Sequence, residues 1–281
     1  FGATSLKCPS CGAPISPQFG EMVITCAYCG TGVTLGNDGW KGIRKQTMLP
    51  LNFVDKEKVR AEVHSLMDRG LLRRHLEENS TLEEMNLSLI PYWIISVSAR
   101  TSIIATDVAV EAGTIGTEAA LIAIMMGGMG GGYGRHRGRF MMAGPVLGGA
   151  MMGAGMGGGA MKTYEMDNNY NFPIVALKAL TEYQPKNYHF NLGERELFDV
   201  SKIPKDIKIL NGDIGEEAAG YQAKTLVVQL QSDKAHEQYH MIQQLHTEID
   251  VAEAELLHVP IWFVRYDHKG NKIVLVIDGN S

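Results

Sequence analysis

Four cysteines are the residues of this sequence whose type and spacing most clearly indicate chemistry. All cysteines of the 281-residue chain fall within its first 29 residues, as Cys8, Cys11, Cys26 and Cys29. The two-residue spacing lets both thiolates of a pair reach one tetrahedral ion. A glycine follows each pair, and its positive φ can turn backbone N–H groups towards the sulfur atoms. The pattern C-x2-C-x14-C-x2-C predicts a zinc ribbon with one structural Zn²⁺; two redox disulfides or a rubredoxin-like iron site are the alternatives.

Four thiolate ligands close the coordination sphere of a metal, so the expected ion is structural rather than catalytic. Its binding energy would hold together about thirty residues, which are too few to bury a core of their own. We place the ribbon at residues 1–36 and expect a short hairpin at residues 15–25. Zinc ribbons occur in nucleic-acid machinery, in enzymes and in adaptor proteins, so the ribbon alone assigns no function.

A second chemical pattern is H-E-x-x-H, which His236, Glu237 and His240 match. In zinc metallopeptidases the two histidines lie one helical turn apart and bind the metal, while the glutamate polarises a water molecule. The third residue after the second histidine is Gln243 rather than the glycine of metzincins, so we expect the helix to continue. On a continuous helix His246 lies off the face that carries the pair. We therefore assign no catalytic residue and keep a metallopeptidase as an alternative.

The composition separates one segment from an otherwise ordinary chain. There are 26 Lys and Arg against 31 Asp and Glu, and this net charge of -5 argues against a protein that coats nucleic acid. Of the 32 Gly and 15 Met, residues 125–161 hold 15 Gly and 9 Met. The excess is therefore local, and the rest of the chain has the composition of a globular protein.

This Gly/Met-rich segment allows three interpretations. Residues 119–164 contain no acidic residue, and Arg135, Arg137 and Arg139 separate two apolar arms. It can be a flexible surface insertion, because Gly-rich chains are costly to order. It can be a membrane-inserting or interfacial hairpin, because residues 140–161 carry no charge and are long enough to span a bilayer. It can also mediate self-association, because methionine adapts to contact surfaces and glycine permits close packing.

The elements between the ribbon and this segment are expected to be a linker at residues 31–47, a strand at 50–54, a helix and two strands. Asp55 is the expected N-cap of a helix that runs to about residue 78. Its apolar stripe consists of Val59, Val63, Leu66, Met67 and Leu71. Strands are expected at residues 87–97 and 101–110.

The last third of the chain repeats this order. Two helices are expected at residues 213–230 and 232–245, the first capped by Asp213. A long strand at residues 256–266 and a returning strand at 272–277 follow, joined by a turn at 268–271.

Two strand cores align at an offset of 169 residues, so that Pro91 matches Pro260 and Trp93 matches Trp262. Proline within a strand is confined to an edge or a bulge, and the tryptophan two residues later points to the same face. We interpret the tryptophans as anchors that pack on their helices rather than as ligand platforms. The alignment predicts a duplicated α-β-β unit.

A zinc ribbon, a Pro-x-Trp strand and a terminal Val-Pro-x-Trp-x-Val-x-Tyr hairpin ending in Asp-Gly resemble an uncharacterised family of prokaryotic zinc-ribbon proteins. Members are often labelled primosomal or replication-factor-Y-like, a label that reflects shared zinc knuckles. The resemblance covers residues 8–110 and 210–281 and leaves out the Gly/Met-rich segment. It implies the ribbon and the repeated strands but no established activity.

The predicted fold is α+β, with the ribbon at residues 1–36 followed by a duplicated body of antiparallel strands. The first α-β-β unit covers residues 48–112, the Gly/Met-rich insertion covers 113–162, and the second unit with a connecting segment covers 163–281.

The function predicted from these features is that of a non-enzymatic, cytoplasmic zinc-ribbon adaptor or scaffold. Its expected partners are proteins or further copies of the chain, with contact to a membrane surface through residues 119–161 as a further interpretation. The remaining alternative is a nucleic-acid-associated factor that uses the ribbon and the three arginines of the insertion. No small-molecule substrate is indicated.

Overall fold

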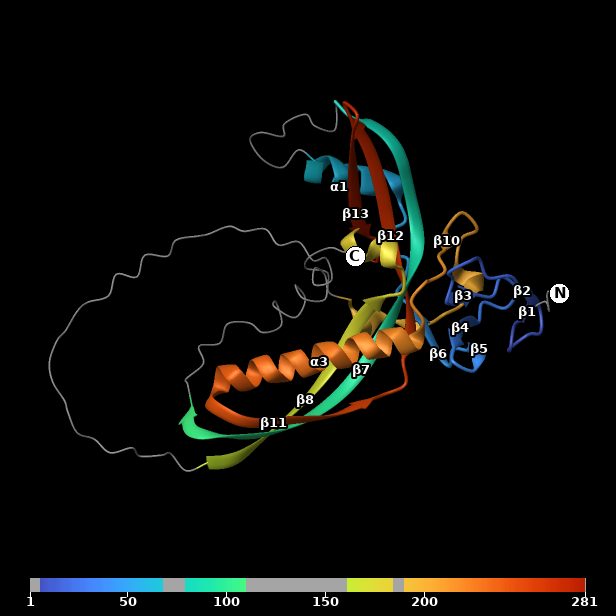
Figure 1. The fold of residues 1–281 in the computed structure, drawn as a ribbon. Coiled ribbons are helices and arrows are strands. Elements are labelled where there is room, and N and C mark those ends of the chain that lie inside the picture. The colour runs from blue at the N-terminus through green and yellow to red at the C-terminus, as the bar shows by residue number, and fades with distance from the viewer. Residues whose placement is uncertain (1–5, 68–78, 110–160, 184–189, 281) are drawn as a thin grey trace.

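The computed structural model describes residues 6–67, 79–109, 161–183 and 190–280 (Figure 1). Within these ranges sheet is the dominant structure and two α-helices pack against it. The fold therefore belongs to the α+β class, as the sequence predicts. The Gly/Met-rich insertion lies outside the described residues except for Met161 and Lys162, which begin a strand.

The N-terminal residues form two small sheets. Strand β1 pairs with β2, and β3, β4 and β5 form a three-stranded sheet. The bounds are β1 Leu6–Lys7, β2 Pro14–Ile15, β3 Val23–Thr25, β4 Gly32–Gly36 and β5 Gly39–Gly42. The predicted hairpin at residues 15–25 is wrong, because β2 pairs back with β1 and β3 pairs forward with β4. The predicted turn residues 36–39 do form a turn, although it joins two strands rather than interrupting a linker.

One large sheet forms the body, with the strand order β10-β7-β12-β6-β9 and with β8, β11 and β13 paired beside this path. The bounds are β6 Lys45–Met48, β7 Thr81–Ala109, β8 Met161–Val175, β9 Glu196–Leu197, β10 Lys208–Ile209, β11 Tyr239–Val251, β12 Glu255–His268 and β13 Asn271–Asp278. Short 3₁₀-helices cover Lys178–Tyr183, Leu192–Glu194 and Val200–Lys202. The strand predicted at residues 50–54 is replaced by β6, which lies a few residues earlier because it pairs in parallel with β12.

Strand β7 is a 29-residue spine that merges the two strands predicted at residues 87–97 and 101–110. One of its edges carries β12 and then β11, and the other carries β10 and then β8. Pro91 lies where the second edge passes from β10 to β8, and its carbonyl accepts a hydrogen bond of 2.9 Å from the N–H of Ala176. A proline fits this central strand because no partner at that point requires its missing N–H.

The second half of β7 forms a three-stranded arm with β8 and β11, and helix α3 (Glu216–Gln238) covers one face of it (Figure 1). Alternate β7 residues, from Val97 to Ala105, are buried under the helix. The opposite face of the arm carries polar side chains, including Ser98, Arg100 and Asp167. The alternation follows from the two-residue period of a strand with one covered face.

Helix α1 (Lys56–Met67) begins as the sequence predicts. The carboxylate of Asp55 accepts a hydrogen bond of 2.9 Å from the N–H of Glu57, as expected of a cap. From the predicted stripe, Val59, Val63 and Met67 are buried and pack in one cluster with Trp262.

Helix α3 corrects two predictions. It runs without a break from Glu216 to Gln238, so the two predicted helices at residues 213–230 and 232–245 are one helix followed by strand β11. The residues from Leu245 to Val251 alternate apolar and polar side chains, and their pairing with β7 outweighs the expected helix continuation. The N-cap is Gly215 rather than Asp213, whose carboxylate instead accepts a hydrogen bond from the N–H of Lys178.

The two Pro-x-Trp strands lie side by side in the sheet, and Ile90 pairs with Val259, with Pro91 and Pro260 one residue to either side of this pair. The indole N–H of Trp93 donates to the carbonyl of Ile214, just before α3, over 2.8 Å. The indole N–H of Trp262 donates to the carbonyl of Phe53, just before α1, over 2.7 Å. Both tryptophans are buried, which excludes the ligand-platform interpretation, and each anchors the helix that precedes the other Pro-x-Trp strand.

Candidate metal centre

The two cysteine pairs form knuckles with the same backbone geometry. In the first, the N–H of Gly12 donates to the carbonyl of Cys8, and in the second the N–H of Gly30 donates to the carbonyl of Cys26, each over 2.9 Å. The φ angles of Gly12 and Gly30 are 73° and 77°. Residues with a Cβ adopt this left-handed conformation at a cost, which explains why glycine follows each pair.

The four sulfur atoms lie within 4.8 Å of one another. The Sγ atoms of Cys8 and Cys29 are 3.7 Å apart, and those of Cys11 and Cys26 are 3.8 Å apart. A tetrahedral ion with metal–sulfur bonds of about 2.3 Å separates its ligands by about 3.8 Å. A disulfide requires a separation of about 2.05 Å, so this arrangement of free cysteines fits one metal ion and not a pair of disulfides.

Thr31 forms a hydrogen bond with Cys29, in the second cysteine pair. Its hydroxyl lies 3.2 Å from the Sγ of Cys29, and its hydrogen bond lowers the pKa of that thiol to about 6. The protonated thiol of Cys29 donates to this hydroxyl, and after the thiol ionises the hydroxyl can donate to the sulfur instead. The second arrangement stabilises the thiolate, which is the form that binds a metal. Cys8 and Cys26 are buried while Cys11 and Cys29 are exposed, so the site has one solvent-facing side.

Gln46 connects the second knuckle to the core of the body. Its Oε1 accepts a hydrogen bond of 2.7 Å from the N–H of Gly32, and its Nε2 donates to the carbonyl of Gly30 over 3.1 Å. The same amide nitrogen lies 3.0 Å from Nε2 of His258 on β12. Because an amide nitrogen can only donate, this histidine nitrogen accepts, and the ring proton lies on Nδ1. Burial lowers the pKa of His258 to about 3, so the ring is neutral, and it packs against Phe198.

A second connection joins the ribbon to the start of α3. The N–H of Gly212 donates to the carbonyl of Val23 over 2.7 Å, and the N–H of Val23 donates back over 3.0 Å. Lys41 forms an ion pair of 2.9 Å with Glu216, in the first turn of the helix. Val23 also lies in the hydrophobic cluster that contains Trp93. The ribbon is therefore built into the packing of the body.

Sequence reasoning missed a buried carboxylate at the same junction. Glu255 on β12 accepts a hydrogen bond from the hydroxyl of Thr47 and forms ion pairs with Lys45 and Arg195. Its side chain is 4% exposed, and its three partners come from β6 and from the loop before β9. The charge therefore has the partners that a buried carboxylate requires. The only sequence signal was an acidic residue at the start of an apolar strand.

The H-E-x-x-H residues do not share one helix. His236 and Glu237 belong to the last turn of α3, whereas His240 belongs to β11. Nδ1 of His236 lies 2.7 Å from the carbonyl of Ser232. His246 lies further along β11 and is exposed, on the arm face away from α3. Among the described residues, the four cysteines are the only group of three or more His, Cys, Asp or Glu side chains placed to hold a metal.

Two other predicted features fall outside the described residues. Arg135, Arg137 and Arg139 belong to residues 110–160, as does nearly all of the apolar sequence at residues 119–161. Within the part of the chain that the structure describes, neither helix combines the length and the apolar character needed to span a bilayer.

No protein-family model, curated protein or solved structure matches this chain.

Proposed function

We propose that the protein is a non-enzymatic scaffold. In this proposal the zinc ribbon stabilises the body, and the arm holds the Gly/Met-rich segment where it can contact a partner, a second copy of the chain or a membrane surface. The placement of the segment's ends carries this proposal. Thr106 pairs with Met161, and Ala109 pairs with Tyr239, so the chain leaves and re-enters the fold at the tip of the arm. The ribbon lies at the opposite end of the molecule (Figure 1). Such a segment can meet a partner while the body and the metal site keep their structure.

We assign the metal as zinc and the site as structural. Four cysteine thiolates leave no coordination position for a substrate, and the sulfur separations suit a tetrahedral ion. Bound there, zinc would supply folding energy to the ribbon and, through Gln46 and Gly212, to the body. Unpaired thiols also suit a reducing compartment, which supports a cytoplasmic location.

We further propose that the body consists of two copies of one unit, related by a local two-fold axis at the Ile90–Val259 pair. Two kinds of hydrogen bond support this assignment because each occurs once in either copy. One is the bond from each indole N–H to the carbonyl just before a helix, and the other is a bond to the carbonyl of each strand proline. The N–H of Ala176 donates to the carbonyl of Pro91, and the N–H of Gly279 donates to that of Pro260. On this assignment the turn between β12 and β13 corresponds to the tip of the arm, where the Gly/Met-rich segment is inserted.

Replacing residues 110–160 tests the scaffold proposal. One variant closes the arm with a short turn, and a second variant replaces the segment with a Gly/Ser chain of equal length, so that loss of the side chains is separated from loss of length. We expect both to keep the thermal midpoint of the intact chain, because the segment starts and ends at one point of the sheet. Compared with the intact chain, both variants should show one of two losses. Either the oligomeric mass falls in size-exclusion chromatography with light scattering, or the protein no longer floats with anionic vesicles. Unchanged mass and unchanged flotation would refute the role of the segment.

A further inference from the structure

The outer edge of β8 is an unpaired sheet edge. β8 pairs with β7 in unbroken register over fifteen residues, from Met161 opposite Thr106 to Val175 opposite Tyr92. No strand among the described residues pairs with its other side. A regular edge of this length is a template for strand addition.

The hydrogen-bonding direction of β8 follows from one contact. The N–H of Ala176 donates to Pro91, and alternate residues of an antiparallel ladder bond to the same neighbour. The even-numbered residues of β8 therefore bond to β7, and the odd-numbered residues direct their N–H and C=O groups to the open edge. These are Thr163, Glu165, Asp167, Asn169 and Asn171. Pro173 ends this row, because it has no N–H to offer.

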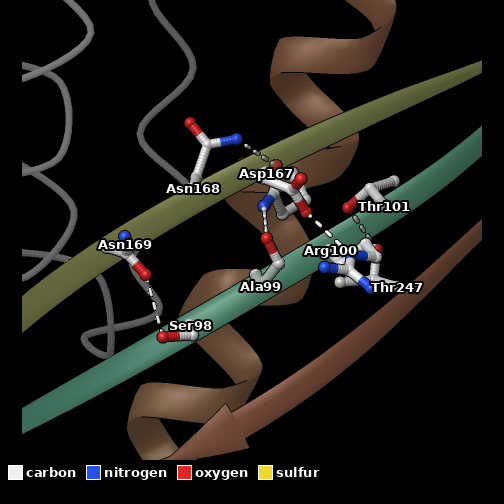
Figure 2. Close-up of polar contacts among 9 residues, drawn as sticks. Ser98, Ala99, Arg100, Thr101, Asp167, Asn168, Asn169 and Thr247 are labelled. Carbon is white, nitrogen blue, oxygen red and sulfur yellow. Dashed lines mark hydrogen bonds and ion pairs between the residues drawn. The ribbon is translucent and has the colours of Figure 1, made fainter.

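The side chains of the same residues are exposed, and three of them are held in position. Nε of Arg100 donates to Oδ1 of Asp167 over 3.0 Å. The hydroxyl of Ser98 donates to Oδ1 of Asn169 over 2.8 Å, and that of Ser96 donates to Oδ1 of Asn171 over 2.7 Å. Figure 2 shows Asn169 with this oxygen turned towards Ser98. The NH₂ group of each amide makes no hydrogen bond with a described residue, so both remain available as donors.

We propose that the β8 edge binds the β8 edge of a second copy of this chain, in antiparallel register about Asn168. In this register Asp167 lies opposite Asn169 of the second copy, and Glu165 lies opposite Asn171. Each carboxylate then faces a free amide donor, and each such pair exchanges two backbone hydrogen bonds. A shift of two residues in one strand places Asp167 opposite itself, and a shift of four places Glu165 opposite Asp167. A shift of two residues in the opposite direction pairs Asp167 with Asn171 but places Asn169 opposite itself and Glu165 opposite Pro173. The proposed register therefore forms the most carboxylate–amide pairs, and this charge complementarity makes the edge fit a second copy of itself.

The α3 helices of two copies do not obstruct this pairing. Helix α3 packs mainly on β7 and β11, which leaves Tyr164, Met166 and Tyr170 of β8 half-buried beside the edge. In the proposed dimer both helices lie on the same face, four strand spacings or about 19 Å apart. A helix is about 10 Å across, so the two do not collide. Tyr170 then lies opposite Met166 of the second copy, a favourable sulfur–aromatic contact.

The other open edge of the arm is less suited to pairing. The register of β11 shifts twice between Tyr239 and Gln244, and Met241 has a φ of 51°. A bulge of this kind interrupts the row of edge donors. The proposed contact therefore belongs to β8. It rests on the proposed scaffold function only in that self-association is one of the two kinds of contact proposed there. The surfaces differ, because one is β8 and the other is the Gly/Met-rich segment.

Three variants of the full chain test the register. Asn169→Asp places a second carboxylate opposite Asp167 in both halves of the dimer. We expect it to weaken dimerisation in light scattering or ultracentrifugation by roughly 2- to 30-fold. The exchange Asp167→Asn with Asn169→Asp restores the complementarity and should return dimerisation towards that of the intact chain. Gln244→Glu makes the same charge change on exposed β11 and is the matched control, expected to leave dimerisation unchanged.

Circular dichroism and the thermal midpoint of each variant establish that it is folded. A monomeric intact chain would overturn the proposal, as would equal dissociation constants for Asn169→Asp and Gln244→Glu, or an exchange variant no tighter than Asn169→Asp. The replacement of residues 110–160 separates the two surfaces. If that replacement alone removes the dimer, the scaffold role of the segment stands and the β8 contact fails. If the dimer survives replacement but responds to the β8 variants, the β8 contact stands, and the role of the segment then depends on whether the replacement removes vesicle flotation.

Discussion

At the scale of single residues, Thr31 controls how readily the cysteine site holds a metal as the pH falls. Its hydroxyl makes the largest contribution among the hydrogen bonds that lower the pKa of Cys29 to about 6; the N–H of Thr31 and the sulfur atoms of Cys11 and Cys26 contribute the rest. The Cys29 thiolate therefore persists below the usual range of a free cysteine. The hydrogen bond stabilises the thiolate both with and without metal, and its effect on binding cancels above the ordinary thiol pKa. Below that pKa a chain without this hydrogen bond must release a proton from Cys29 to bind the metal, whereas the intact chain keeps the thiolate down to about pH 6.

Thr31→Val should therefore release zinc at a higher pH than the intact chain. Near pH 6 the apparent affinity should fall by roughly tenfold or more, since a hydrogen bond to a charged group contributes about 1.5–3 kcal/mol. A chromogenic chelator that reports zinc release across a pH series measures the change. Thr31→Ser keeps the hydroxyl and should behave as the intact chain does. An equal loss of affinity at pH 6 and at pH 9 would contradict this account, because it would indicate a packing defect.

At the scale of elements, the two tryptophans explain how the helices are fixed to the sheet. Trp93 reaches the carbonyl of Ile214 before α3, and Trp262 reaches the carbonyl of Phe53 before α1. A buried carbonyl that loses its only donor costs about 1–3 kcal/mol. Each helix is therefore positioned at its start by a strand that is remote in sequence.

Trp93→Phe and Trp262→Phe should each lower the free energy of unfolding by about 1–3 kcal/mol, with the larger value at Trp93, whose hydrogen bond is the more buried of the two. Urea unfolding followed by circular dichroism measures this. Trp40→Phe, at a half-buried position of β5, is the control and should cost under about 1 kcal/mol. A large loss at one buried tryptophan and none at the other would contradict the proposed two-fold arrangement.

At the scale of the whole molecule, the ribbon and the body form one structure. The contacts between Val23 and Gly212, and those of Gln46, connect the metal site to α3 and to β12. The cluster around α1 contains no ribbon residue among those described. Metal loading should therefore affect one half of the body more than the other.

We expect one zinc per chain by elemental analysis. Its removal by a chelator should increase amide hydrogen exchange in the ribbon and in the first turn of α3. Exchange in α1 should change least, and this helix is the internal control. Increased exchange confined to the ribbon would contradict the coupling. A second zinc that disappears in His240→Ala would instead favour the metallopeptidase alternative.

Local signals account for what could be predicted from the sequence. The spacing of the cysteines and the glycines after them predicted the cluster that can hold a metal ion, because a knuckle needs only neighbouring residues. The cap at Asp55 and the turn before Asn271 were predicted for the same reason, and both are present. The two Pro-x-Trp strands were recognised because their pattern occurs twice.

Non-local pairing decided the rest. Helix α3 ends at Gln238 because the following residues pair with β7, a strand more than a hundred residues earlier. In the ribbon, β2 pairs with β1 and β3 pairs with β4, instead of forming the expected hairpin with each other. Glu255 forms ion pairs with Lys45 and Arg195, which are remote from it in sequence. By itself the sequence determined the four cysteines that can hold a metal ion and the strand cores. Only the tertiary structure decided which strands are neighbours, which helix each tryptophan holds and which edge stays open, because these depend on contacts between segments that no local pattern connects.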